Sequence, residues 1–153
     1  MVEKLISGAQ TGADRAALDV ALELGIPCGG WVPKGRLAED GTIPARYPNL
    51  TETSGSAVEI RTEWNIRDSD ATLILSHGQL DGGSLYTQIK AEKLGKPWLH
   101  IDFLETGPEQ APAIARSWLN RIQPKVLNIA GPRATKDPGI YDATVRFLRK
   151  VLK

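Results

Sequence analysis

Two kinds of hydrophobic pattern alternate along the chain. Short apolar runs, typical of buried strands, occur at positions 5–6, 26–29, 71–76, 98–102 and 126–130. Each run is followed, directly or after a loop, by a stretch with the apolar spacing of an amphipathic helix. Strands that alternate with helices are typical of α/β proteins. We therefore expect a three-layer Rossmann-like fold in one domain over residues 1–153, with about five mostly parallel strands and helices on both faces.

Individual residues predict where the helices begin and which side they bury. Thr11, Ser56 and Asp137 are suitable N-cap residues for the first, second and last helices, and Gly25 marks the end of the first. The expected buried faces are Ala17, Val20, Ala21 and Leu24 in the first helix; Ala57, Ile60 and Trp64 in the second; Leu85, Ile89 and Leu94 in the third; Ala111, Ile114, Ala115, Trp118, Leu119 and Ile122 in the fourth; and Tyr141, Val145, Leu148 and Leu152 in the last.

The segment at 5–21 carries the clearest binding signal. A strand passes through a turn that contains Gly8 and Gly12 and directly enters a helix. Free backbone N–H groups and the positive end of the helix dipole favour an anion there, and glycine lets a ligand approach the backbone closely. The turn also carries the polar side chains of Gln10, Thr11 and Asp14. The spacing matches no specific nucleotide-binding motif, so a tight turn without a ligand is the alternative.

A long connection at 30–55 has no clear hydrophobic period and is interrupted by three prolines. Connections of this length inside a compact domain are often functional. Aromatic and cationic side chains along it are suited to cover an anionic ligand: Trp31, Lys34, Arg36, Arg46 and Tyr47. A solvated loop with a few aromatic anchors is the alternative.

A second glycine pair, Gly82 and Gly83, precedes the third helix, for which Ser84 is the expected cap. Because parallel strands end at the same edge of a sheet, the loops that follow them lie together. In flavodoxin-like strand orders the first and third strands are neighbours, so their glycine loops would form one anion site. Arg133, after the last strand, would supply a fixed positive charge.

Composition and charge exclude several classes of protein. The formal net charge of +1 argues against a protein that coats nucleic acid. A single cysteine, Cys28, excludes an internal disulfide and a CxxC metal site. His77 and His100 lack partners at metal-ligand spacing, so we expect no metal site. Without a signal peptide or a long apolar run, we expect no membrane partner and a cytoplasmic location.

Five segments carry a resemblance to a known family: GAQTGADRAALDVA (8–21), GWVPKGRLAEDG (30–41), RTEWNIRDSDATLIL (61–75), GGSLYT (82–87) and LNIAGPR (127–133). In these segments the chain resembles the molybdenum cofactor carrier proteins over nearly the whole domain. That family belongs to a wider Rossmann-like superfamily that binds nucleotide-related ligands and includes the phosphoribohydrolases of the "lonely guy" type. The resemblance implies a phosphorylated ligand at the glycine loops, either the molybdenum cofactor (molybdopterin) or a nucleotide.

These observations favour a carrier that binds a phosphorylated small molecule at the carboxyl edge of the sheet. The expected ligand-binding residues are Gly8, Gln10, Thr11, Gly12, Asp14, Trp31, Lys34, Gly82, Gly83, Ser84 and Arg133. Related folds pair through their helices, so a homo-oligomer is one interpretation of the apolar helix faces; burial of these faces in the core of a monomer is the alternative.

A nucleotide-processing hydrolase is the alternative function. The similar phosphoribohydrolases pair a GGxGT loop with a glutamate shortly into the next helix. Here GGSLYTQI (82–89) has Tyr86 in place of the threonine and Gln88 in place of a carboxylate. Because an amide cannot act as a general base, such an enzyme would need Asp14 or Asp68 for that role.

Overall fold

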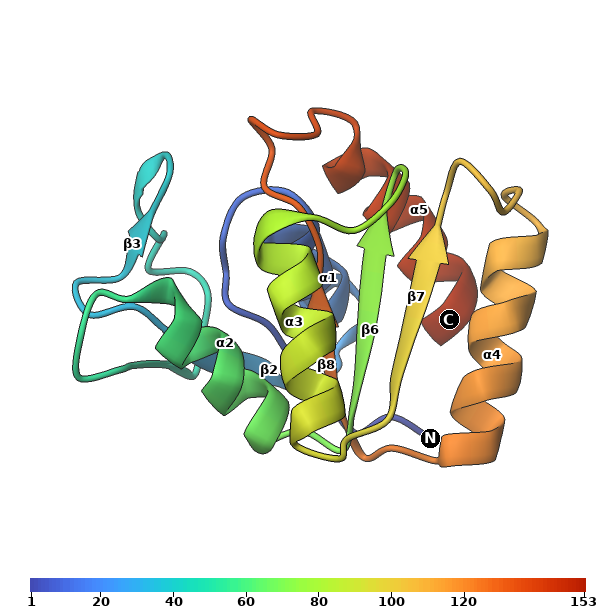
Figure 1. The fold of residues 1–153 in the computed structure, drawn as a ribbon, viewed down its shortest axis with the longest axis horizontal. Coiled ribbons are helices and arrows are strands. Elements are labelled where there is room, and N and C mark those ends of the chain that lie inside the picture. Colours follow the sequence, from blue (N-terminus) through green and yellow to red (C-terminus); the bar gives the residue numbers. More distant parts are fainter.

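The computed structural model describes residues 1–153 and contains a parallel six-stranded sheet with five helices around it (Figure 1). The strand order is β5-β2-β1-β8-β6-β7, and a separate hairpin is formed by β3 and β4. The strands are β1 (Lys4–Ile6), β2 (Cys28–Val32), β3 (Leu37–Ala38), β4 (Gly41–Thr42), β5 (Leu50–Glu52), β6 (Ala71–Ser76), β7 (Trp98–Asp102) and β8 (Val126–Ala130). The helices are α1 (Ala13–Leu24), α2 (Val58–Arg67), α3 (Gly82–Lys93), α4 (Gln110–Ile122) and α5 (Ile140–Leu152). None of these helices has the length and apolar character needed to cross a membrane.

Successive strands are added on opposite sides of the centre of the sheet, although all of them run parallel. From β1 the chain continues to β2 and β5 on one side, whereas β6 continues to β7 on the other, and β8 is inserted between β1 and β6. Right-handed crossovers then require α1 and α3 to cover opposite faces. Figure 1 shows α2 and α3 in front of the sheet and α1 and α5 behind it. The loops after β8 and β6 therefore diverge, which opens a crevice at the carboxyl edge.

The predicted Rossmann-like α/β fold is confirmed, with six strands in the main sheet rather than about five. The runs at 71–76, 98–102 and 126–130 are strands with the predicted bounds. Every residue of β6 is buried, as its unbroken apolar run indicates. The strand expected at 26–29 begins two residues later, at Cys28. The sequence pattern misses β5 because this edge strand is only three residues long and largely exposed.

One expected neighbour relation is wrong. The first and third predicted strands, β1 and β6, do not pair with each other, because β8 lies between them and pairs with both. Leu5 lies opposite Leu127 in the register, and Leu127 in turn lies opposite Ala71. The glycine loops after β1 and β6 are thus separated by the width of one strand.

The predicted helix caps are also corrected. Helix α1 has Gly12 as its N-cap, and the Thr11 hydroxyl instead donates to the carboxylate of Glu39. Ala57 rather than Ser56 precedes α2, and the last helix begins at Ile140 rather than next to Asp137. No helix has a side-chain hydrogen bond at its N-cap. The predicted end of α1 at Gly25 is confirmed, with φ of 71°.

The helices on the two faces of the sheet differ in how well the apolar pattern predicts burial. In α1 and α4 most of the predicted positions are buried or packed against the core, although Ile114 is exposed. In α3, Leu85, Ile89 and Leu94 are exposed, contrary to expectation. Its buried side chains are Thr87 and Ala91, whose small volume allows the helix to lie close to β6 and α2. The predicted stripe of α2 is likewise displaced: Ala57 is exposed, and Asn65 and Ile66 are buried.

The connection at 30–55 packs against the body of the protein. Asp40 in its hairpin forms an ion pair with Arg15 of α1, and Arg46 binds Asp19 on the same helix. Tyr47 is buried in the main core. This segment therefore supports α1 and the rim of the sheet.

Gly131 illustrates how tightly the three central strands meet. An added Cβ at this position would lie 2.6 Å from the Ala13 side chain and 2.6 Å from the carbonyl oxygen of Leu75. We expect Gly131→Ala to destabilise the protein by about 1–3 kcal/mol, because rigid neighbours must move to accept one methyl group. Urea denaturation measures this change. Gly107→Ala is the control, since a Cβ at Gly107 meets nothing within 4 Å. Equal free energies of unfolding for the two variants would contradict the packing described here.

Candidate functional site

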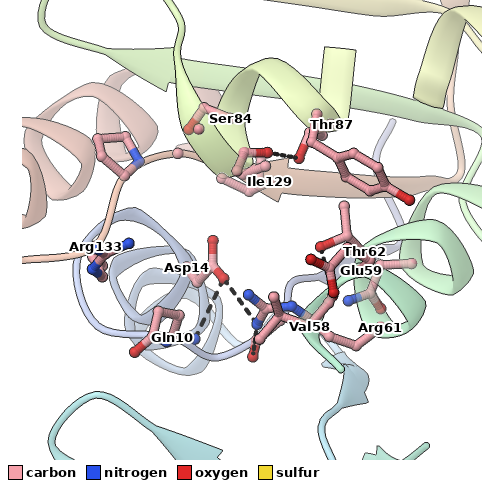
Figure 2. Close-up of a pocket in the computed structure, with 18 of the residues that line it drawn as sticks. Gln10, Asp14, Val58, Glu59, Arg61, Thr62, Ser84, Thr87, Ile129 and Arg133 are labelled. Carbon is pink, nitrogen blue, oxygen red and sulfur yellow. Dashed lines mark hydrogen bonds and ion pairs between the residues drawn. The ribbon is translucent and has the colours of Figure 1, made fainter. Parts of the chain in front are cut away.

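A cleft of about 490 Å³ opens at the carboxyl edge of the sheet, where the loops after β1, β6 and β8 diverge. One wall is α2 and another is the start of α3, and Figure 2 shows Ser84 and Thr87 across the opening from Asp14 and Arg61. The lining residues are Gly8, Gln10, Asp14, Val58, Glu59, Arg61, Thr62, Asn65, Asp81, Gly82, Gly83, Ser84, Tyr86, Thr87, Asn128, Ile129, Ala130, Gly131, Pro132, Arg133 and Lys136. Most of them are polar, charged or glycine.

The N-terminus of α3 presents unpaired backbone donors to this cleft. Its N-cap Asp81 makes no capping hydrogen bond, and the amides of Gly82, Gly83 and Ser84 have no acceptor in the protein. The first amide with a partner is that of Leu85, which donates to the Asp81 carbonyl at 3.1 Å. Such unpaired N–H groups, together with the helix dipole, can hold an anion. The backbone at Gly83 is open, because a Cβ there would meet nothing within 4 Å.

Two cations line the cleft, and one of them, Lys136, lies beside these amides. The Lys136 ammonium lies over Gly82, where an added Cβ would be 3.0 Å from its Nζ atom. The same ammonium pairs with the exposed carboxylate of Asp81. Arg133 is more than half exposed, and its Nε atom is 3.2 Å from Glu39. Both cations are held by carboxylates but remain accessible to solvent, so a ligand anion can compete for them.

Asp14 is the most buried ionisable group of the cleft, with 9% of its side chain exposed. Its Oδ2 atom accepts a hydrogen bond from the Gln10 amide at 3.3 Å and lies 3.7 Å from Arg61. Burial raises the pKa of Asp14 to about 6, while the positive charge of Arg61 acts in the opposite direction. The Oδ1 atom has no partner in the protein, and Figure 2 shows the side chain pointing into the cleft. This oxygen is available to accept a hydrogen bond from a ligand.

Arg61 connects two walls of the cleft. From α2 it reaches the loop after β1, where its Nη1 atom donates to the Gly8 carbonyl oxygen at 2.7 Å. The guanidinium lies so close to Gly8 that any Cβ at this position would overlap it. Glycine is therefore needed at position 8 for this close approach. It is not needed for an unusual dihedral angle, since Gly8 has no positive φ, whereas the next residue, Ala9, has a φ of 57°.

The structure brings seven of the sequence-predicted residues into the cleft: Gly8, Gln10, Asp14, Gly82, Gly83, Ser84 and Arg133. It leaves Thr11, Gly12, Trp31 and Lys34 outside the cleft lining. Gly12 packs against the backbone at 132–134, and the first amide of α1, that of Ala13, donates to the Pro132 carbonyl oxygen. The N-terminus of α1 is thus partly closed by the protein itself, in contrast to that of α3.

Trp31 and Asp68 belong to a different contact. The Trp31 indole N–H donates to Asp68 at 2.7 Å, and its ring packs edge-on against Trp64. The Trp31 backbone N–H donates to Asn65 Oδ1, and the Trp31 carbonyl oxygen accepts from Asn65 Nδ2. The Asn65 side chain thus satisfies both backbone groups of Trp31, as a neighbouring strand would. Hydrogen bonds from Arg67 and Trp31 lower the pKa of Asp68, which does not line the cleft.

Sequence reasoning missed several residues of the site, including Glu59, Tyr86, Thr87, Asn128 and Lys136. Arg61 and Asn65 share one face of their helix with Asp68, and all three turn toward the loop after β1 or toward β2. This spacing was the available signal, because three polar residues at i, i+4 and i+7 indicate a helix face with polar partners.

His77 pairs with Asp137 and His100 with Ser76, both at 2.7 Å. No group of three histidine, cysteine or acidic side chains is arranged to hold a metal ion.

Comparisons with known proteins agree with this architecture. Residues 5–152 match the family model described as "Circularly permutated YpsA SLOG family". A crystal structure from Syntrophus aciditrophicus SB, described as a "Putative molybdenum carrier protein", is 54% identical to this chain with a TM-score of 0.97. The match covers 99% of this chain and 96% of that one. No curated protein sequence gives a significant match. The sheet order, the full-length family match and the similarity to a solved structure together show that the chain belongs to the circularly permutated YpsA SLOG family.

Proposed function

We propose that the protein is a carrier that binds a phosphorylated pterin or a nucleotide-like molecule in the cleft at the carboxyl edge of its sheet. The phosphate lies against the N-terminus of α3, and the planar ring system lies toward Asp14. The description of the 54% identical structure as a molybdenum carrier protein supports this proposal.

The unpaired N-terminus of α3 is the observation that carries the proposal. Three consecutive amides without acceptors belong to residues that line the same cleft as Lys136. A phosphate has enough acceptor oxygens to bond to these amides and to the ammonium at the same time. Gly83 lets it reach the backbone without steric hindrance.

The carboxylate of Asp14 is suited to bind a ligand ring that carries two adjacent N–H donors. Pterins and guanine share an edge in which a ring N–H lies beside an exocyclic amino group, and a carboxylate can accept from both. Adenine presents an unprotonated ring nitrogen at the corresponding place and repels a carboxylate. The unpaired Oδ1 atom of Asp14 therefore favours pterin or guanine over adenine.

The molybdenum cofactor fits this donor set as a cargo. Its phosphate would be held by the α3 amides and Lys136, and the donor edge of its pterin by Asp14. The cleft lining contains no histidine or cysteine that would bind the metal. The α3 amides, Lys136 and Asp14 would therefore bind the organic part of the cofactor. The cofactor would supply the bound metal, and the protein's role would be to hold the intact molecule.

Gly83→Val is expected to weaken binding of guanosine monophosphate by about tenfold or more, because the side chain fills the space needed by the phosphate. Isothermal titration calorimetry measures the dissociation constant. The matched control is Gly107→Val, since Gly107 also has open space at its Cβ but lies outside the cleft. Unfolding curves should show both variants folded. Unchanged affinity in a folded Gly83→Val protein would exclude a phosphate at this helix.

Asp14 predicts a pH dependence of binding. The ligand's donors require the ionised carboxylate, whose pKa in the folded protein is about 6, so affinity falls as the pH drops below 6. A phosphate monoester also titrates near pH 6. Binding of guanosine monophosphate between pH 5 and 8 to the wild type and to Asp14→Asn separates the two titrations. The wild type should show the steeper loss at low pH, and parallel curves would contradict the role of Asp14.

Removal of the Asp14 charge is expected to raise the free energy of unfolding at neutral pH. The Asp14 pKa is raised from 3.8 to about 6, so the native carboxyl holds its proton more tightly than the unfolded one. Stability therefore falls as the pH rises from about 4 to 6, and the full penalty applies at pH 7. Asp14→Asn should raise the free energy of unfolding at pH 7 by up to about 3 kcal/mol and should give little change at pH 4. Urea denaturation at both pH values measures the difference, and a variant less stable at pH 7 would contradict this account.

A hydrolase remains the second candidate function, because a carboxylate with a pKa of about 6 inside a cleft can act as a general base. Asp14 satisfies this condition. Asp68 is outside the cleft, with its pKa lowered, and Gln88 does not line the cleft.

The carrier and the hydrolase give different results in one incubation. If the protein is a carrier, guanosine monophosphate should be recovered intact after incubation at pH 7, with no free guanine detected by liquid chromatography. Steady release of guanine that is lost in Asp14→Asn, with ligand binding measured in the same variant, would establish the hydrolase instead.

A further inference from the structure

A second chamber of about 270 Å³ adjoins the cleft at the α3 N-terminus. The two spaces share the lining residues Asp81, Ser84, Pro132 and Lys136. The second chamber is formed mainly by the loop after β6 and by the residues that precede α5. Its volume is slightly below the range of about 300–1,000 Å³ typical of complete ligand sites. Size and continuity indicate a place for one part of a ligand whose other part lies in the cleft.

An ion pair between Lys136 and Asp81 forms the boundary between the two spaces. The Asp81 side chain is 70% exposed and that of Lys136 is 38% exposed, so the pair is not locked by burial. Ion pairs this exposed contribute little stability. A ligand phosphate at the adjacent amides can take the place of Asp81 as the partner of Lys136, and the boundary then opens.

The lining of the second chamber suits a sugar and a base rather than an apolar group. His77 and Gln79 come from the loop after β6, and Asp137 lies opposite them. The Nδ1 atom of His77 lies 2.7 Å from Asp137, which fixes the imidazole ring and leaves its Nε2 atom for another partner. Only one lining residue, Leu80, is hydrophobic. These groups offer both donors and acceptors to the hydroxyl groups of a ribose.

We propose that the site takes a two-part ligand, in which a pyrophosphate at the N-terminus of α3 joins one ring system in the cleft to a second nucleoside in this chamber. The proposal rests on the proposed binding of a phosphorylated ligand and specifies its class as dinucleotide-like. The arrangement follows from the topology, because the loops after β6 and β8 meet at the carboxyl edge and contribute residues to both spaces. A ligand phosphate at the α3 N-terminus therefore borders the cleft and the second chamber.

Three guanine nucleotides test this proposal by calorimetry: guanosine monophosphate, guanosine diphosphate and diguanosine pyrophosphate. Only the third has a second nucleoside, so it should bind at least about tenfold more tightly than the diphosphate. Gln79→Trp fills the second chamber from an exposed loop position and should remove this advantage, while the affinity for the mono- and diphosphate is unchanged. Gln110→Trp is the matched control, because it adds the same side chain at an exposed position outside the cleft and the second chamber.

The outcomes separate this inference from the proposed function. Equal affinity for the diphosphate and the dinucleotide would show that the second chamber is only a solvent-filled space, and the inference would be wrong while the proposed function stands. An advantage of the dinucleotide that survives Gln79→Trp would also overturn it. If none of the three nucleotides binds to the wild type, the proposed function fails and this inference fails with it.

Discussion

The contact of Arg61 with the loop after β1 is the interaction on which both the fold and the cleft depend. It ties α2 to the carboxyl end of the central strands through the Gly8 carbonyl oxygen, and its charge lies 3.7 Å from the buried Asp14. The positive charge of Arg61 lowers the pKa of Asp14 and so opposes the effect of burial, which raises it. One side chain thus fixes a wall of the cleft and favours the ionised form of its buried acid. The absence of a Cβ at Gly8 is the local condition that makes the contact possible.

The order of strands explains why the cleft lies where it does. The last strand, β8, occupies the centre of the sheet between β1 and β6, so a chain that began at β8 would extend outward from the centre in both directions. This is the arrangement that a circular permutation of a Rossmann-like fold produces, in agreement with the family to which the chain belongs. The permutation moves the ends of the chain without moving the carboxyl edge. Loops after β1, β6 and β8 therefore still meet at the reversal point, where α/β proteins commonly bind ligands.

Features of this protein that depend on a local sequence pattern can be predicted from the sequence. Features that depend on contacts between residues far apart in the chain cannot. The strands β6, β7 and β8 are recognisable because their runs have sharp bounds in the sequence. Thr11 was expected to cap α1, but Glu39 binds its hydroxyl, and no local pattern reports a contact across that distance. The glycines before α3 do reach the cleft, because a strand, a glycine pair and a helix suffice to place them. Gly12 does not, because its position is set by the backbone that follows β8.

The most direct test of the central claim is an amide chemical-shift titration of the ¹⁵N-labelled protein with guanosine monophosphate at pH 7. It compares two helix N-termini within one molecule: that of α3, whose first amides lack acceptors, and that of α1, where the first amide already has one. Saturable shifts are expected that are largest at Gly83 and Ser84, with small changes at Gly12 and Ala13. Shifts centred on α1, or on a surface away from the cleft, would contradict it.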